Sequence, residues 1–366
     1  MKNVSKKVLI LGASGIVGYA AMKHFRTVEG CEVVGVARRP PADTFGAKTV
    51  ALDLTDSEAC AAVIDSHPDV THVLYAAVQE SSDVSSGWRS TEQIDLNDRM
   101  FRNILGPLVE RSRTLQHVAL LQGGKAYGSH VRKVPPIPVR EGKDEWRTQD
   151  NFYWRHEDYL RQSQMGRSWR WTILRPPAIF GEAIGSALSK IGPIGVYGAI
   201  LKEKGLPLSF PGGERRIRQT MDADLLARCI AWAGVSPNAH NEVFNVSNGD
   251  VYTWQDLWPT VASAMAMEVG EPSPHSLAAE LPKRSAEWDV IRQKYGLVAP
   301  PLMEFVGSSL TYLDWTWSYN VPNPPSSIMS CVKIMKAGFT EVMDTEDMMR
   351  DLFKRYQDKR LLPPVG

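Results

Sequence analysis

The chain has 366 residues, a formal net charge of +1 and a hydrophobic fraction of 43%. This length allows one large domain or two unequal ones, and the near-neutral charge excludes a bulk electrostatic attraction to nucleic acid or to an anionic membrane. Its apolar runs fall short of the roughly 20 residues that span a bilayer, and a strand-like run begins directly after MKNVSKK. We therefore expect a cytoplasmic globular protein without a signal peptide.

Cysteine and tryptophan usage narrows the class further. The four cysteines, Cys31, Cys60, Cys229 and Cys331, form no CxxC pair, which is typical of a reduced compartment and predicts neither a disulfide framework nor a metal site. Of the 11 tryptophans, more than half lie beyond residue 230. We expect an apolar pocket or a large aromatic core in that part of the chain.

Strand-like and helical patterns alternate in the first half of the chain. Short apolar runs predict strands at residues 7–11, 33–37, 49–52, 72–76, 117–121 and 172–174. Helical spacing falls between them, at residues 16–25, 57–64, 96–110 and 154–164. Nearly continuous apolar strands that alternate with helices indicate a parallel sheet buried on both faces. The predicted fold is therefore α/β, with a Rossmann-type doubly wound sheet.

After Gly181 the pattern becomes mainly helical. It predicts helices at 186–203, 223–232 and 253–267, with Asp222 capping the second, a strand at 243–246, and a last proline-rich break near 320–327. We infer a nucleotide-binding Rossmann domain and a smaller, mainly helical substrate-binding region that is interleaved with it. The predicted boundaries are 1–182, completed by about 213–250, for the first and 183–212 with 251–366 for the second.

A glycine turn near the start of the chain indicates a dinucleotide site. The segment VLILGASGIVGYAAM combines a strand, a turn and a helix in the pattern GxxGxxG. Such glycines permit the tight turn, the approach of backbone to a pyrophosphate and the close packing of helix on strand, while the helix start offers N–H groups to the phosphates. The predicted contacts are Gly12, Ser14, Gly15, Ile16, Val17 and Gly18.

The end of the second predicted strand selects the nucleotide. Enzymes that use NAD usually carry an Asp or Glu here, but this sequence has VVGVARRPP. The guanidinium groups of Arg38 and Arg39 suit a 2′-phosphate, which favours NADP(H) over a merely solvated basic turn. Asp53 and Leu54, directly after the third strand, are placed to border the adenine. Asp53 has an alternative role as the cap of the helix that begins at Ser57.

The ends of later strands complete the predicted cofactor site. Its members there are Ala76, Gln122, Lys125, Tyr153, Pro176 and Ile179. The turn RPPAIFG leaves the sixth strand in a direction that its two prolines restrict, and its backbone near Ile179 can contact the nicotinamide carboxamide.

The expected catalytic pair departs from the usual spacing. Short-chain dehydrogenases carry a lysine four residues after the catalytic tyrosine, whereas Glu157 stands four residues after Tyr153. After the fifth strand, where such enzymes place a serine, the sequence has LQGGKAYG, so that Lys125 follows two glycines. We predict that Lys125 and Tyr153 converge beside the nicotinamide ribose. The alternatives are a core aromatic for the tyrosine and a surface turn for the lysine.

Other polar residues near these motifs have more ordinary expected roles. Tyr127 is expected to pack beside the site, and His130 and His156 to be structural or exposed. Asn151 either caps the helix that follows it or acts directly. Asn97 either supports the active-site backbone or is simply a polar position on a helix.

Aromatic residues alternate in LTYLDWTWSYN, residues 310–320. Trp315, Trp317 and Tyr319 either line an apolar substrate cavity or pack in the core.

Several motifs in this order resemble the progesterone 5β-reductase and iridoid synthase-like enzymes, an atypical branch of the extended short-chain dehydrogenases. They are GASGIVG, VGVARRP, LQGGKAYG, NFYWRHED, RPPAIFG and FNVSNGDVYTWQDLW, and they extend from residue 12 to 258. The resemblance implies catalytic roles for Tyr153 and Lys125 and an NADPH-dependent reduction of the C=C bond of an α,β-unsaturated carbonyl compound. Trp154 departs from the family's NFYYxxED pattern, and the last 100 or so residues match more loosely, so that substrate-pocket residues do not transfer.

Other functions remain open on the residues alone. A carbonyl reductase would use the same scaffold, since the substrate's pose decides which carbon receives the hydride. A non-catalytic NADP(H)-sensing protein would not need a tyrosine–lysine pair, and a sugar-nucleotide epimerase is disfavoured because Tyr-x-x-x-Lys is missing. We expect a small apolar carbonyl substrate, with neither nucleic acid nor membrane as partner; a homodimer is left open.

Overall fold

The computed structural model describes all residues except 1–5, 82–86, 132–133, 187, 322–325 and 366, and part of the proline-rich break expected near 320–327 therefore lies outside the described residues. The chain divides into two units. The first unit comprises Met1–Pro177, Ala223–Ser247 and Met329–Glu341; the second comprises Ala178–Asp222, Asn248–Ile328 and Val342–Gly366. Segment 329–341, which the sequence pattern assigns to the substrate region, thus belongs to the unit that holds the sheet.

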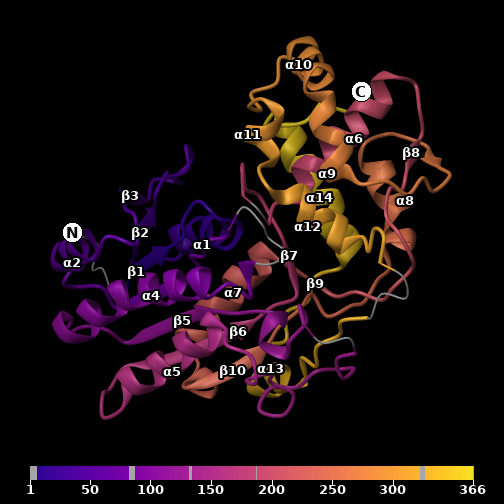
Figure 1. Ribbon diagram of the computed structural model, residues 1–366. Helices are drawn as coiled ribbons and strands as arrows, with labels where there is room; N and C mark the ends of the chain where they lie inside the picture. The colour runs from indigo at the N-terminus through magenta and orange to yellow at the C-terminus, as the bar shows by residue number, and fades with distance from the viewer. Residues whose placement is uncertain (1–5, 82–86, 132–133, 187, 322–325, 366) are drawn as a thin grey trace. The chain divides into compact units, whose positions relative to one another are not determined.

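A seven-stranded parallel sheet forms the centre of the first unit, in the order β10-β6-β5-β4-β1-β2-β3 (Figure 1). Its strands are β1 (Lys6–Leu11), β2 (Cys31–Ala37), β3 (Lys48–Ala51), β4 (His72–Tyr75), β5 (His117–Leu121), β6 (Arg170–Arg175) and β10 (Glu242–Asn245). The unit's helices are α1 (Ile16–Thr27), α2 (Ser57–Asp65), α4 (Thr91–Arg111), α5 (Phe152–Gln164), α7 (Ala223–Ala233) and α13 (Val332–Ala337), with 3₁₀ turns η1 (Gly124–Tyr127) and η2 (Pro237–Ala239). The predicted Rossmann-type fold is confirmed.

Alternate side chains of the strands explain why helices cover both faces of this sheet. Leu9 and Leu11 of β1 lie in one apolar cluster with residues of α2, α4 and α5, such as Ile64, Phe101 and Leu160. Their neighbours Val8 and Ile10 are equally buried but point to the opposite face, because successive side chains of a strand alternate. Helices α1 and α7, which pack on each other, supply no residue to the first cluster. Burial on both faces is what makes these strands apolar throughout.

The second unit is mainly helical. Its helices are α6 (Ile191–Glu203), α8 (Trp254–Ala264), α9 (Leu277–Glu280), α10 (Ser285–Lys294), α11 (Leu302–Val306), α12 (Ser309–Thr316) and α14 (Thr345–Asp358), with the 3₁₀ turn η3 (Leu281–Arg284). Two short parallel pairs, β7 (Ala178–Phe180) with β9 (Thr220–Asp222) and β8 (Leu208–Ser209) with β11 (Val269–Gly270), were not expected from the sequence. Strands of two or three residues carry too little periodicity to be recognised, because distant partners define them.

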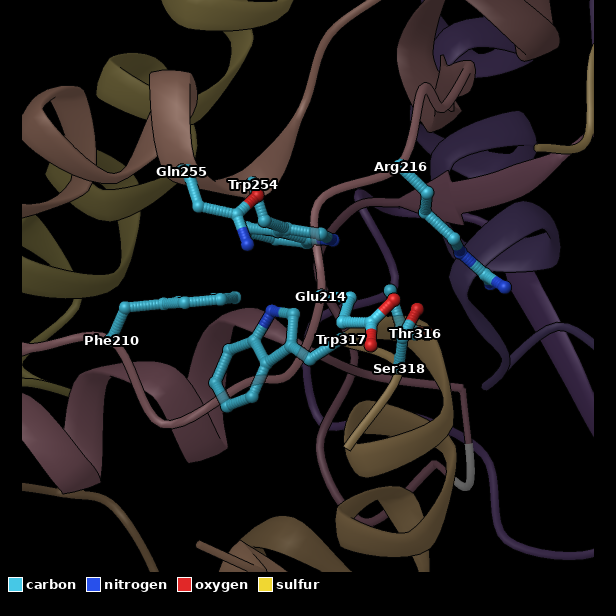
Figure 2. Close-up of a pocket in the computed structure, with 8 residues that line it drawn as sticks. All are labelled: Phe210, Glu214, Arg216, Trp254, Gln255, Thr316, Trp317 and Ser318. Atoms are coloured by element: carbon cyan, nitrogen blue, oxygen red, sulfur yellow. The ribbon is translucent and has the colours of Figure 1, made fainter. Parts of the chain in front are cut away.

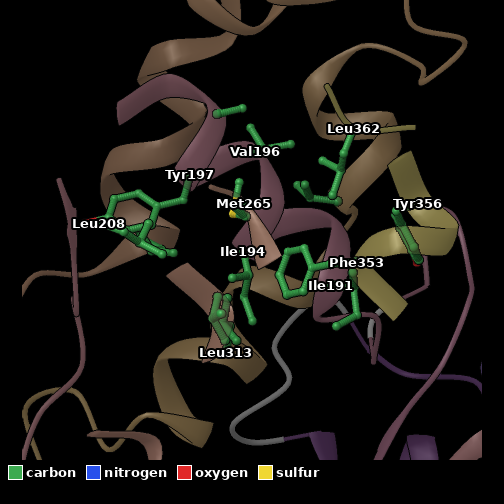
Figure 3. Close-up of a cluster of buried hydrophobic side chains, with 14 of the residues drawn as sticks. Ile191, Ile194, Val196, Tyr197, Leu208, Met265, Leu313, Phe353, Tyr356 and Leu362 are labelled. Carbon is green, nitrogen blue, oxygen red and sulfur yellow. The ribbon is translucent and has the colours of Figure 1, made fainter. Parts of the chain in front are cut away.

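Buried apolar side chains from all parts of the second unit form one core (Figure 3). Helix α6 is buried on every side, and Tyr356 and Leu362 close the cluster from the C-terminal end of the chain. Trp258 and Trp317 meet at 5.5 Å between ring centroids with their planes perpendicular, a geometry that aromatic pairs prefer. The aromatic core expected from the tryptophan count is therefore present. Within the described residues, no helix is both long and apolar enough to cross a membrane.

Two helices are shorter than predicted. Helix α6 begins at Ile191 rather than at 186, since the hydroxyl of Ser189 donates to the carbonyl of Ala183 and its N–H to that of Ser186, which holds the segment in a turn. Helix α8 ends at Ala264 rather than at 267, because Ala266 adopts a positive φ of 49°.

Candidate functional site

The glycine turn between β1 and α1 leaves room for a phosphate group. Gly12 has a φ of 92°, and a Cβ atom at Gly18 would lie 2.2 Å from the carbonyl oxygen of Gly12, so only glycine fits there. Gly15 precedes α1 without a side-chain cap, and the first turn of α1 contains no carboxylate. Uncapped N–H groups and a partial positive charge suit a pyrophosphate. These features fit the predicted dinucleotide.

The two arginines expected to select the nucleotide follow β2 directly. Arg38 and Arg39 are exposed. Asp53 accepts hydrogen bonds from the N–H and hydroxyl of Thr55, and these bonds, together with the positive charge of Arg38, lower the pKa of the Asp53 carboxyl. Asp56, not Asp53, caps α2 by accepting from the N–H of Ala59. The alternative role of Asp53 as a helix cap is therefore wrong, and its carboxylate lies in the electrostatic field of Arg38.

The remaining predicted cofactor residues lie at or just after strand ends. Leu54 and Pro176 are buried, and Ala76 is half-buried directly after β4. Ile179 lies in β7 of the second unit. Gln122 is buried, and its side-chain amide donates a hydrogen bond to the carbonyl of Tyr153. Their contact with a cofactor stays a prediction.

Lys125 and Tyr153 meet at a common neighbour, Trp88. The Nζ atom of Lys125 lies 3.6 Å from the centroid of the Trp88 ring, and the rings of Trp88 and Tyr153 meet edge to face at 5.2 Å. The indole N–H of Trp88 donates to the carboxylate of Glu80 at 3.0 Å. The hydroxyl of Tyr153 lies 3.6 Å from where the Cβ atom of a side chain at Gly123 would stand. Gly123 thus places no side chain beside that hydroxyl, just after the carboxyl end of β5.

Burial and the nearby charges of Glu80 and Arg175 shift the pKa values of Lys125 and Tyr153. Burial lowers the pKa of Lys125 to about 8, against the opposing charge of Glu80. Burial, reinforced by Glu80, raises the pKa of Tyr153 above its usual value. The charge that lowers the pKa of Tyr153 is that of Arg175, at the end of β6. The ammonium group of Lys125 lies over the indole ring of Trp88.

The backbone of Tyr153 is held at both ends. Asn151 accepts a hydrogen bond from its N–H at 2.9 Å, which confirms Asn151 as the cap of α5. The side-chain amide of Gln122, directly after β5, donates to its carbonyl oxygen at 3.0 Å. The start of α5 is therefore fixed against the carboxyl end of β5.

Glu157, at the position where a lysine is usual, forms a buried ion pair with Arg175. One carboxylate oxygen of Glu157 accepts from Arg175 at 3.0 Å, and only 1% of the Arg175 side chain and 4% of the Glu157 side chain are exposed. The other oxygen accepts from Arg147 and Arg161, both at 3.0 Å and both partly exposed. This ion pair was not predicted from the sequence, because Arg175 was considered only as part of the turn RPPAIFG.

Three further residues have roles inside the protein. Tyr127 is buried and donates to Asn245 at 2.5 Å, as expected for a residue beside the site. His156 is buried against the carbonyl of Asn97 at 2.9 Å, and burial lowers its pKa to about 4, which confirms a structural role. His130 is half-buried beside Trp88, and among the residues that the structure describes neither of its ring nitrogens has a hydrogen-bond partner.

Asn97 supports the loop segment at Gln79, which follows β4. Its side chain accepts from the N–H of Gln79 at 2.8 Å and donates to the carbonyl of Gln79 at 2.9 Å, and it is fully buried. The alternative of a merely polar helix position is therefore excluded. Trp88 and Glu80 were not recognised from the sequence, because neither follows a motif and only the fold brings them close to Lys125.

A small hollow lies within the second unit (Figure 2). Its walls include the rings of Phe210, Trp254 and Trp317, with the carboxylate of Glu214 at its edge. Trp317 is buried and belongs to the core, whereas 39% of Trp315 is exposed. Of the three alternating aromatics, only Trp317 lines this hollow.

Comparisons with known proteins identify relatives of this chain. The model of the NAD dependent epimerase/dehydratase family matches residues 8–247. The (S)-8-oxocitronellyl enol synthase of Antirrhinum majus is 28% identical over 97% of this chain and 92% of its own, and the 3-oxo-Delta(4,5)-steroid 5-beta-reductase of Arabidopsis thaliana is 34% identical over 71% and 69%. The UDP-glucose 4-epimerase of Thermotoga maritima has a similar fold, with a TM-score of 0.68 at 16% identity over 96% of this chain and 99% of its own.

The sheet, the glycine turn and these relatives define an oxidoreductase of the extended short-chain dehydrogenase type with a site for a nicotinamide cofactor. The chain belongs to the NAD dependent epimerase/dehydratase family, in the branch that contains the progesterone 5β-reductase and iridoid synthase-like enzymes.

Replacing Asn97 tests its support of the loop. Asn97→Ala leaves the N–H and carbonyl of Gln79 without these partners, and we expect the free energy of unfolding to fall by about 2–5 kcal/mol, since each unsatisfied buried group costs about 1–3 kcal/mol. Urea unfolding followed by circular dichroism measures this change. Arg99→Ala, exposed on the same helix, is the control and should change it by less than about 0.5 kcal/mol. Equal effects of both variants would contradict the role of Asn97.

Proposed function

We propose that this enzyme reduces the C=C bond of α,β-unsaturated carbonyl compounds with NADPH. The observation that carries the proposal is the meeting of Lys125 and Tyr153 around Trp88, with Gly123 placing no side chain beside the tyrosine hydroxyl. Relatives named as an enol synthase and as a steroid 5-beta-reductase support the reaction class. The absence of a lysine at position 157 separates this arrangement from that of ordinary alcohol dehydrogenases.

Tyr153 stabilises the charge that develops during the reaction. When bound, the reduced nicotinamide supplies a hydride to the β-carbon of the substrate. Negative charge then develops on the carbonyl oxygen, and the hydroxyl of Tyr153 donates a hydrogen bond to it. Because burial and Glu80 raise the pKa of Tyr153, the hydroxyl keeps its proton and acts as a donor. This interaction is strongest in the transition state and therefore accelerates the reaction.

Lys125 acts through its charge and its donors. Lys125 would hold the ribose hydroxyls of the cofactor when it is bound. The rings of Trp88 and Phe152 lie 4.5 Å apart and form a small apolar cluster beside Tyr153. Apolar surroundings of one hydrogen-bond donor suit a small carbonyl compound.

A substrate panel tests the reaction class. It contains small enones, a steroid enone, an unsaturated dialdehyde and the matching saturated ketones, each with NADPH, and product analysis identifies the reduced bond. We expect C=C reduction, and a fall in kcat of about 100- to 1,000-fold in Tyr153→Phe with NADPH still bound. Lys125→Ala should also lose turnover. Reduction of the ketones alone would instead assign a carbonyl reductase, and unchanged turnover in both variants would reject the mechanism.

The choice of NADPH over NADH depends on Arg38 and Arg39. Each guanidinium that holds the 2′-phosphate contributes a charge-assisted hydrogen bond of about 1.5–3 kcal/mol. We therefore expect Arg38→Ala and Arg39→Ala each to raise the Kd of NADPH about 10- to 100-fold, with the Kd of NADH unchanged. Fluorescence titration with both cofactors measures these constants. Equal weakening for NADH and NADPH would show that the arginines do not read the phosphate.

The lowered pKa of Lys125 predicts a limit at alkaline pH. The charged form is lost as the pH rises through about 8, so kcat/KM for NADPH, which reports the free enzyme, should fall above this pH. Lys125→Arg keeps its charge, and its profile should stay level to higher pH even if its overall rate is lower. Profiles from pH 6 to 10 measure both. A wild-type profile that stays level to pH 10 would exclude Lys125 as the titrating group.

A further inference from the structure

Four side-chain and backbone groups form a closed ring of hydrogen bonds behind Tyr153. Gln122 donates to the carbonyl of Tyr153 at 3.0 Å, and its amide oxygen accepts from the Nε of Arg175 at 2.7 Å. Arg175 in turn donates to Glu157 at 3.0 Å. Since Glu157 stands one helical turn after Tyr153, the α5 backbone closes the ring. The ring therefore joins the ends of β5 and β6 to the first turn of α5.

This ring consists of buried groups, which makes its geometry restrictive. Gln122, Glu157 and Arg175 are all at most 5% exposed. A buried charge that loses its partner is strongly unfavourable, so each member constrains the others to one arrangement. The Nε and Nη2 groups of Arg175 donate to Gln122 and Glu157, and a planar guanidinium donates only in fixed directions.

Further charged side chains surround this ring of hydrogen bonds. Glu157 shares its negative charge among Arg175, Arg147 and Arg161. Arg175 also donates to Glu145 at 3.0 Å. Among the charges that act on Tyr153, Arg175 favours the phenolate and Glu80 disfavours it. The Arg175 guanidinium thus supplies a positive potential at Tyr153. In ordinary short-chain dehydrogenases the lysine four residues after the tyrosine supplies this potential.

We propose that Arg175 is a positioning residue for Tyr153, acting through Gln122 and Glu157. The ring sets the direction of the tyrosine hydroxyl toward the space beside Gly123, and the positive charge of Arg175 favours the partial loss of the hydroxyl proton as the substrate oxygen becomes negative. This proposal rests on the proposed role of Tyr153 as donor, and it holds for either carbon that receives the hydride. Displacement of a reacting group by about 1 Å can reduce a rate about 100-fold.

Gln122→Met and Arg175→Gln test the ring, with Arg161→Gln as the matched control. Arg161 binds the other oxygen of Glu157 from an exposed position, so its loss leaves the ring intact. On whichever carbonyl compound the wild type reduces, we expect kcat to fall about 10- to 100-fold in the two ring variants. KM for the compound and the Kd of NADPH should change by less than about threefold, and kcat of Arg161→Gln by less than about twofold.

A double-mutant cycle separates positioning from general damage to the fold. If Gln122 acts through the hydroxyl of Tyr153, then Gln122→Met should cause little further loss of kcat in a Tyr153→Phe background. Arg175→Gln should behave in the same way, and circular dichroism at the assay temperature checks that the variants are folded. Losses that multiply in the double variants, or equal losses in Arg161→Gln, would overturn the proposal while leaving the reaction class intact. A wild type that reduces no member of the panel would reject the proposed function itself.

Discussion

A buried ion pair between Arg175 and Glu157 holds the site together. Removing both charges from water is costly, and Gln122, Tyr127 and Glu145 offset part of this cost by accepting further hydrogen bonds from the guanidinium. The pair joins the end of β6 to the second turn of α5, while Gln122 joins both to the end of β5. This junction therefore positions the site residues that follow these strands.

The same junction explains the neighbouring aromatic residues. Trp154, the departure from the family pattern, places its ring 5.4 Å from the guanidinium of Arg175 and 4.4 Å from that of Arg147. Its indole N–H donates to the carbonyl of Trp146 at 3.1 Å. Trp154 therefore covers the ion pair rather than the reacting groups. The aromatic side chains that lie against the Tyr153 ring are those of Trp88 and Phe152.

The sequence predicted those parts of the structure that local patterns determine. Apolar periodicity located the strands of the sheet, because it depends on residues close in the chain. The glycine turn was predictable for the same reason. Asn151 was likewise recognised as a candidate helix cap, but two helices were predicted to begin at 96 and 154, whereas α4 begins at Thr91 and α5 at Phe152. The start of α6 was not predictable, because the hydroxyl of Ser189 competes with the helix for a backbone carbonyl. The short strand pairs were not predictable, because their partners lie far apart along the chain.

The candidate site was predicted only in part, for a related reason. Motifs identified Lys125, Tyr153 and the arginines after β2, each of which stands beside a recognisable turn. Trp88 and Arg175 were not predicted, because their contacts join residues that lie far apart in the sequence. The pKa shifts of Lys125 and Tyr153 were not predictable either, because they depend on burial in the folded protein.

Isotope transfer tests the proposed reaction most directly. NADPH that carries deuterium at C4 of the nicotinamide, on the transferred side, is given to the enzyme with an unsaturated carbonyl compound that it turns over. Nuclear magnetic resonance then locates the deuterium in the product. Deuterium on the β-carbon, with the carbonyl group retained, is the predicted result. Deuterium on the carbonyl carbon of an unsaturated alcohol would contradict C=C reduction and assign the enzyme to carbonyl chemistry.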